Sequence, residues 1–140
     1  MEDVIISQTT GRVGIRLCHP ERDPRGNLEY FSVEVSDPTT IRAQTRVYAY
    51  HPESLAALFD EMAREWRGWS GAKEWASVEG ELTLSCTTDG KGHVDIAIRV
   101  KESLYPDSWR VQATALVEAG QLEAIAKSVR AFIAHSGRAA

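Results

Sequence analysis

Six segments of the chain alternate hydrophobic with polar residues, which is the spacing of half-buried β-strands. Three lie in the first half, at 13–18, 28–35 and 41–50, and three in the second half, at 78–86, 94–100 and 109–117. A shorter apolar segment at 4–7 predicts one more strand. The sequences between them, such as SDPTT, TDGKG and YPDS, are typical of tight turns, so consecutive strands are expected to be antiparallel.

Two segments have hydrophobic residues three and four positions apart, which predicts amphipathic helices. The first covers residues 52–66, where Pro52 suits a first helical turn and Glu53 lies near the positive end of the helix dipole. The second covers residues 121–135, and Gly137 follows it as a stop signal. The stripe of the first helix, which we expect to be buried, contains Leu55, Leu58, Phe59, Met62 and Trp66.

The predicted order is four strands, a helix, three strands and a helix. The chain has 140 residues, the length of a single domain, which we expect to cover 1–140. Because the connections are short and each strand has one hydrophobic side, we expect an α+β fold with an antiparallel sheet of six or seven strands. Both helices are expected to pack on one face of that sheet.

Composition narrows the classes of partner. The chain has 20 Asp and Glu residues against 16 Lys and Arg, a formal net charge of -4, so nucleic-acid binding is disfavoured and a basic protein partner suits it better. No apolar run approaches the length of a membrane span, and the first residues lack the features of a signal peptide. We therefore expect a cytoplasmic protein that does not bind membranes.

The Trp-rich segment WRGWSGAKEW, residues 66–75, is the most unusual part of the chain. Trp66 belongs to the buried stripe of the first helix, and Trp75 is expected to cover one end of the sheet. Trp69 lies in a loop between two glycines, and such a residue either fills a pocket or contacts a partner. The cations Arg67 and Lys73 can stack on the indole rings. We therefore name Trp69, Arg67 and Lys73 as candidate binding residues.

A second candidate surface is the polar side of the strand at 41–50. It carries Tyr48 and Tyr50 together with Arg42 and Arg46. Tyrosine and arginine are enriched at protein interfaces. This side is expected to bind either a second copy of the chain or another protein.

The acidic residues of the second half offer a third candidate site. Glu79, Glu81 and Asp95 are expected on the sheet face opposite the core, with His93 at the mouth of a hairpin. Carboxylates placed together can catalyse acid–base reactions if burial separates their pKa values. On an exposed sheet face they are more often solvated charges that pair across strands.

Cysteines and histidines show no spacing typical of a nucleophile–base pair or of zinc ligands. Cys18 and His19 are adjacent, so their side chains point to opposite faces of a strand. Cys18 and Cys86 are expected to be buried thiols, and a disulfide remains the alternative if their strands are neighbours. No metal and no cofactor are expected.

The chain resembles a family of small bacterial domains of unknown function. In that family a helix exit with Trp and Gly precedes a W-x-S-x-E-x-x-L segment and a D-x-x-G-H-V hairpin. The matching residues are Trp75, Ser77, Glu79, Leu82, Asp89, Gly92, His93 and Val94. The resemblance covers about residues 28 to 135, and the same pattern is similar to immunity proteins that neutralise wall-associated, contact-dependent toxins.

The resemblance implies a non-enzymatic binding protein, with a toxin as partner. One alternative is a binder of small molecules or sugars in which Trp69 stacks on a ring. Another is a carboxylate-dependent enzyme that uses Glu79, Asp95 or His93. The sequence leaves these alternatives open.

Overall fold

The computed structural model describes residues 3–7, 12–102 and 106–134. Within this part of the chain, four strands and a helix are followed by four more strands and a second helix. The elements are β1 (Val4–Ser7), β2 (Gly14–Arg22), β3 (Leu28–Asp37), β4 (Ile41–Tyr48), α1 (Glu53–Arg64), β5 (Lys73–Ala76), β6 (Leu82–Thr88), β7 (His93–Lys101), β8 (Arg110–Glu118), a short 3-10 helix (Ala119–Gln121) and α2 (Leu122–Ile133). The expected end of the second helix, at His135 and Gly137, lies outside the described residues.

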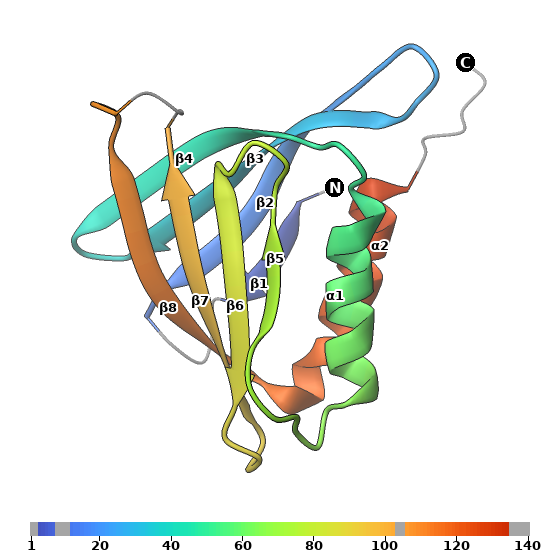
Figure 1. Cartoon of the computed structure of the whole chain (residues 1–140), viewed down its shortest axis with the longest axis vertical. Helices are drawn as coiled ribbons and strands as arrows, with labels where there is room; N and C mark the ends of the chain where they lie inside the picture. Colours follow the sequence, from blue (N-terminus) through green and yellow to red (C-terminus); the bar gives the residue numbers. More distant parts are fainter. Residues whose placement is uncertain (1–2, 8–11, 103–105, 135–140) are drawn as a thin grey trace.

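The strands form two antiparallel sheets of four strands each, in the orders β1-β2-β3-β4 and β5-β6-β7-β8 (Figure 1). The expectation of one sheet with six or seven strands is therefore wrong, although the fold is α+β. Alternation shows which side chains of a strand face inward, but it carries no information on which strand lies beside it. Here α1 follows β4, and β5 starts a new sheet instead of extending the first.

β5 was not predicted because it has only four residues and lies in the Trp-rich segment. It pairs with β6, with Trp75 opposite Leu84. The strand expected at 78–86 begins only at Leu82. The residues before it form a turn, which leaves Val78 exposed.

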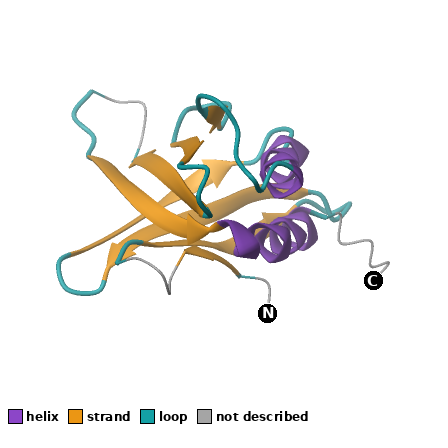
Figure 2. Ribbon diagram, turned by 90° about the horizontal axis from the view of Figure 1, so that it is seen from below, coloured by secondary structure: helices purple, strands orange, loops and turns teal. Residues whose placement is uncertain are grey.

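The two helices pack against each other, and Figure 2 shows them side by side at one side of the molecule. Helix α1 also contacts β5 of the second sheet, whereas α2 contacts β1 of the first. The sequence suggested that both helices lie on one face of a single sheet. This expectation is wrong. The periodicity correctly indicated that each helix buries a hydrophobic stripe. Each helix packs against the other helix and against one sheet, which is the second sheet for α1 and the first sheet for α2.

One hydrophobic cluster includes residues of both sheets and both helices. Its largest fully buried side chains are Phe31, Phe59, Ile15, Leu17, Leu55, Met62, Leu82, Leu84, Ile96, Ile98, Leu122 and Val4. Since inward-facing side chains of both sheets and both helices meet in this cluster, the two halves of the chain depend on each other for burial.

Polar contacts join the two sheets where β4 crosses the second sheet. The carboxylate of Glu81 is only 7% exposed and accepts hydrogen bonds from the backbone N–H of Tyr48 (3.2 Å) and from the hydroxyl of Ser77 (2.7 Å). Nearby, the hydroxyl of Thr45 donates to the backbone carbonyl of Lys101 at 2.9 Å. Buried polar groups need such partners, so these bonds determine where the edge of the first sheet meets the second.

We expect Glu81→Ala to lower the free energy of unfolding by about 1 to 3 kcal/mol, because the Tyr48 N–H and the Ser77 hydroxyl lose their acceptor. Glu79→Ala is the matched control, since Glu79 is an exposed carboxylate two residues away, and its effect should stay within about 0.5 kcal/mol. Urea unfolding followed by tryptophan fluorescence measures both. Equal effects of the two substitutions would contradict the role of Glu81 in joining the sheets.

Candidate functional site

Aromatic and basic side chains gather on the outer face of the first sheet. Tyr30 of β3 lies opposite Tyr48 of β4, and Arg46 lies opposite Ser32. Their alternate neighbours, Phe31, Val33 and Val47, are in the core. We call the group Tyr30, Arg46, Tyr48, Tyr50 and His51 the Tyr/Arg patch.

The rings of the patch form a continuous row. The centroids of Tyr30 and Tyr48 are 5.5 Å apart, and those of Tyr48 and Tyr50 are 6.3 Å apart with nearly parallel planes. His51 meets Tyr50 edge-on at 4.1 Å. Tyr50 is 54% exposed, so this end of the row is open to a partner, whereas Tyr30 and Tyr48 are half-buried.

Arg46 is held in place from two sides. Its guanidinium lies 3.6 Å from the ring centroid of Tyr30, and it donates two hydrogen bonds to the carboxylate of Glu21, at 3.0 and 2.7 Å. The hydrogen bonds from Arg46 lower the pKa of Glu21, and those to Glu21 raise the pKa of Arg46. Both groups therefore remain charged at neutral pH, and the two hydrogen bonds and the Tyr30 ring place the guanidinium beside the row.

The remainder of this sheet face presents guanidinium groups over one buried carboxylate, that of Glu34. Glu34 is buried and lies between Arg16 (3.3 Å) and Arg42 (2.8 Å), while Arg16 also bonds Asp3 at 3.0 Å. The Arg42 side chain is largely exposed. The surface next to the Tyr/Arg patch therefore offers hydrogen-bond donors to solvent, although its formal charges nearly balance.

The connection between β4 and α1 fixes the end of the patch. His51 has a positive φ of 52°, a conformation that non-glycine residues rarely adopt. Its backbone carbonyl accepts a hydrogen bond from the Ser54 hydroxyl at 2.9 Å, and that hydroxyl in turn accepts one from the indole of Trp75 at 2.8 Å. This chain of bonds ties the Tyr/Arg patch to β5 of the second sheet.

The three tryptophans of the Trp-rich segment have different environments. Trp66 is 52% exposed because α1 ends at Arg64, so the expectation that it belongs to the buried stripe is wrong. Trp69 is partly buried against the core, and its indole N–H donates to the backbone carbonyl of Cys86 at 3.1 Å. Trp75 is also partly buried against the core.

Both expected cations of this segment lie over indole rings. The guanidinium of Arg67 is 4.9 Å from the ring of Trp66, and the ammonium of Lys73 is 5.2 Å from the ring of Trp69. Lys73 forms ion pairs with Glu61 and Glu65 of α1, and the hydrogen bond to Glu61 is the main reason why its pKa is raised. These contacts attach the segment to α1 and β6, and we do not include Trp69 in the binding surface.

The acidic candidates are not brought together. Glu81 is buried at the joint between the sheets, so the expectation that it faces outward with Glu79 and Asp95 is wrong. Glu79 lies in the exposed turn before β6, and Asp95 lies on β7 opposite Thr87 and Leu116. The arrangement does not form a pair of carboxylates that share a site.

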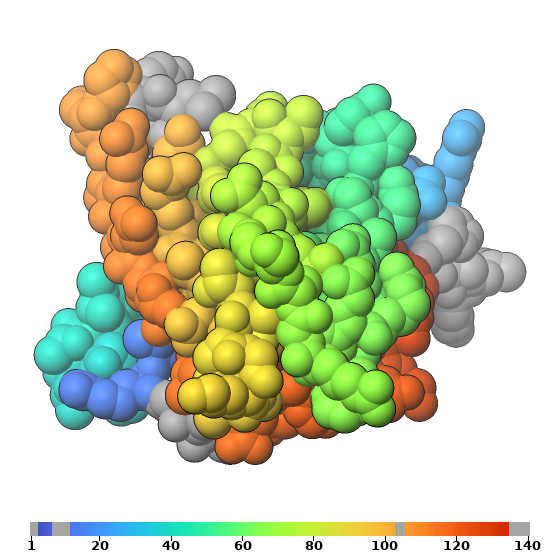
Figure 3. Space-filling model, turned by 60° about the horizontal axis from the view of Figure 1, so that its bottom comes forward, coloured from blue at the N-terminus to red at the C-terminus, as the bar shows by residue number. Residues whose placement is uncertain are grey.

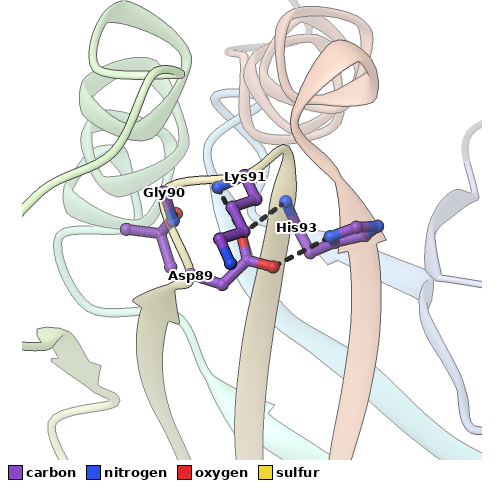
Figure 4. Close-up of polar contacts among 5 residues, drawn as sticks. Asp89, Gly90, Lys91 and His93 are labelled. Atoms are coloured by element: carbon purple, nitrogen blue, oxygen red, sulfur yellow. Dashed lines mark hydrogen bonds and ion pairs between the residues drawn. The ribbon is translucent and has the colours of Figure 1, made fainter.

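His93 contacts a different carboxylate, that of Asp89, in the β6–β7 hairpin (Figure 4). The Nδ1 atom of His93 is 2.9 Å from Asp89 Oδ2, and Asp89 Oδ1 accepts the backbone N–H groups of Lys91 (2.6 Å) and His93 (3.1 Å). The bond from Lys91 and the contact with His93 lower the pKa of Asp89 to about 2. The carboxylate thus closes the turn.

The tip of this hairpin packs close to the exit of α1. A Cβ atom added at Gly68, whose φ is +132°, would approach the Cα of Gly90 to 3.3 Å. The space-filling view in Figure 3 shows the yellow hairpin and the adjacent green segment at the same surface. His93 and Asp89 therefore support a turn, and this explains them without a ligand.

Cys18 and Cys86 are both free and buried, each in a different sheet. Burial raises the pKa of both thiols, that of Cys86 to about 12. Among the described residues, no group of three or more His, Cys, Asp and Glu side chains is arranged to hold a metal ion. No helix of the described part is long and apolar enough to span a membrane.

The fold defines a class of α+β domain in which a four-stranded antiparallel sheet and a helix occur twice in succession. A solved structure with a similar fold is that of the plant transcriptional regulator PBF-2, with a TM-score of 0.51 and 9% sequence identity over 95% of this chain and 81% of that chain. At this identity the likeness concerns the fold alone.

The chain belongs to DUF6228, a family of unknown function, whose model matches residues 6–136. This confirms the expected membership in an uncharacterised family. No curated protein matches the sequence.

Sequence reasoning found Tyr48 and Tyr50 but missed three other contributors, Tyr30, Glu21 and His51. The position of Tyr30 could have been predicted, because a hairpin that pairs Asp37 with Ile41 places residue 30 opposite residue 48. The positions of Glu21 and His51 could not have been predicted, because they depend on a register shift in β2 and on a positive φ at His51. Alternation of side chains reports neither feature.

We expect Trp69→Ala to lower the free energy of unfolding by about 2 to 3 kcal/mol, because it removes a partly buried ring and the bond to Cys86. Trp66→Ala is the control and should cost less than about 1 kcal/mol, the value of an exposed cation–π contact. Thermal and urea unfolding measure both. If the two substitutions destabilise the domain equally, the assignment of Trp69 to the framework is wrong.

Asp89 predicts a defined pH dependence of stability. Because its pKa is lowered in the folded state from 3.8 to about 2, its ionised form stabilises the fold above about pH 4. This contribution is lost as the pH falls towards 2. Urea midpoints of the unsubstituted protein and of Asp89→Ala should therefore differ at pH 7 and converge towards pH 2. The control Asp95→Ala removes an exposed carboxylate of the same hairpin, and its effect on the free energy of unfolding should stay within about 0.5 kcal/mol.

Proposed function

We propose that this domain is a non-catalytic binding protein whose partner is a bacterial toxin that it neutralises, and that the Tyr/Arg patch is the surface that binds. The observation that carries the proposal is the row of Tyr30, Tyr48 and Tyr50 with Arg46 over the ring of Tyr30. The sequence resemblance to immunity proteins supports a toxin as the partner.

The composition of the patch suits a protein partner. Tyrosine and arginine are, with tryptophan, the residues enriched among those that carry most of the binding energy of interfaces. Tyrosine has few rotatable bonds, so it loses little conformational entropy on binding, and a side chain that is already held loses less still. Arg46, held by Glu21 and Tyr30, is such a side chain.

Long-range charge favours a basic partner. The net charge of -4 attracts a positively charged enzyme and raises the rate of encounter. The patch then supplies short-range contacts in which aromatic faces and guanidinium donors carry the specificity. An inhibitor of this kind needs a stable surface and no chemistry of its own.

A groove beside the patch supports a second candidate, a ligand that carries a ring. It has a volume of about 380 Å³ and starts at His51, which touches Tyr50. Its lining mixes polar and apolar groups, namely Asn27, Leu28, His51, Pro52, Glu53, Ile133 and Ala134. A sugar or similar ligand in this groove would contact the ring of His51 rather than Trp69.

The test of the main proposal uses the protein encoded next to this gene, since a toxin and its immunity protein are expected to be neighbours. Co-production should restore growth of cells that make the neighbouring protein, and the two purified proteins should form a complex by calorimetry. Tyr50→Ala should weaken that complex by about 2 kcal/mol, roughly thirtyfold, while the fold remains intact.

Trp66→Ala is the matched control, because Trp66 is 52% exposed and Tyr50 is 54% exposed, on different parts of the molecule. It should leave the affinity unchanged. Absence of a complex, or equal loss of affinity with both substitutions, would overturn the proposal. If a sugar binds and the protein does not, the second candidate replaces it.

A further inference from the structure

In the part of the chain that the structure describes, β8 is the last strand of the second sheet and its ladder is with β7, while β1 of the first sheet also contacts it. It is nine residues long and contains no proline. Figures 1 and 3 show it, in orange, along one side of the molecule. An exposed edge of this length is a template for pairing with another strand.

The register shows which backbone groups of β8 are unpaired. The N–H of Glu102 donates to the carbonyl of Trp109, and the N–H of Ala119 donates to the carbonyl of Gly92. In an antiparallel pair the direction of these groups alternates along the strand. The odd-numbered residues of β8 therefore bond to β7, and the even-numbered residues direct their N–H and C=O groups away from it.

Three of these even-numbered residues have no hydrogen-bond partner for their outward groups among residues 3–7, 12–102 and 106–134. They are Arg110, Gln112 and Thr114. Farther along the strand, Leu116 has another interaction and the Glu118 N–H bonds to the side chain of Gln121. The free edge is thus a defined segment at the start of β8.

The inner face of the same segment is incompletely covered. Trp109 is 37% exposed, and Val111 and Ala113 are only partly buried. On the neighbouring strand β7, in contrast, Val100 opposite Val111 is 0% exposed. An additional strand at the edge would cover this apolar side as well as the backbone groups.

We propose that β8 pairs with β8 of a second copy of this chain, antiparallel, with the twofold axis at Gln112. The free residues 110, 112 and 114 are symmetric about 112, so Arg110 of one copy lies opposite Thr114 of the other. Gln112 then lies opposite itself. In this register the six free N–H and C=O groups of each copy form hydrogen bonds with those of the other. The second sheets of the two copies then form one continuous sheet.

The side chains are compatible with this register. On the inner face, Val111 lies opposite Ala113 of the second copy, which extends the apolar surface. On the outer face no like charges are opposed, because Arg110 faces a threonine and Gln112 faces a glutamine.

A short strand pair buries less area than a permanent dimer requires, so the association is reversible and depends on concentration. The dimer leaves the Tyr/Arg patch free, since that patch belongs to the other sheet. The inference is therefore independent of the proposed function.

The first test is sedimentation velocity of the full chain over about a hundredfold range of concentration. The unsubstituted protein should shift from monomer to dimer. Thr114→Pro removes an outward N–H from an edge strand, a position where proline is tolerated, so the fold should persist by circular dichroism while the dimer is lost.

The second test measures the register directly by oxidative cross-linking. Cysteines in a Gln112→Cys variant would have Cα atoms about 5.5 Å apart across the axis, within the range of a disulfide. Thr114→Cys is the matched control, because its two copies would be four residues out of register, roughly 13 Å apart. Cys18 and Cys86 are buried and do not compete.

The expected result is a cross-linked dimer with Gln112→Cys and none with Thr114→Cys. If Thr114→Pro fails to fold, the two cysteine variants still test whether β8 pairs with β8 of a second copy. A protein that stays monomeric at the highest concentration would overturn the proposal. So would equal cross-linking of the two variants, or an edge that takes up an unrelated extended peptide while the chain does not self-associate.

Discussion

The contact between α1 and α2 is the interaction on which the rest of the structure depends. Each helix follows one sheet in the sequence but contacts a strand of the other sheet, α1 with β5 and α2 with β1. The helix pair therefore links the two halves of the chain, and neither four-stranded sheet buries its inner face without the other half. One hydrophobic core serves both sheets because of this exchange.

The polar joint between the sheets connects this architecture to the candidate binding surface. Tyr48 belongs to the row of rings through its side chain and to the joint through its N–H, which bonds to buried Glu81. At the other end of the row, His51 and Ser54 connect to Trp75 of β5. A surface on the first sheet is thus positioned by residues of the second.

Several features of the site were predictable from the sequence. The alternation in β4 placed Tyr48, Arg42 and Arg46 on the polar side of a strand, and the structure has them there. The stacking of Arg67 and Lys73 on indole rings also follows from neighbouring positions. Glu81 was assigned to the wrong environment, because a carboxylate at the end of a turn is buried only if a donor from elsewhere in the chain reaches it.

The sequence by itself determined the type of nearly every element and the side of each that faces inward, because periods of two and of three to four residues depend on local geometry. Only the tertiary structure decided which strands share a sheet, what covers each helix, and that Trp66 is exposed while Trp69 is bonded to Cys86. Those outcomes depend on contacts between segments that are distant in the chain. The spacing of residues within one segment does not determine such contacts.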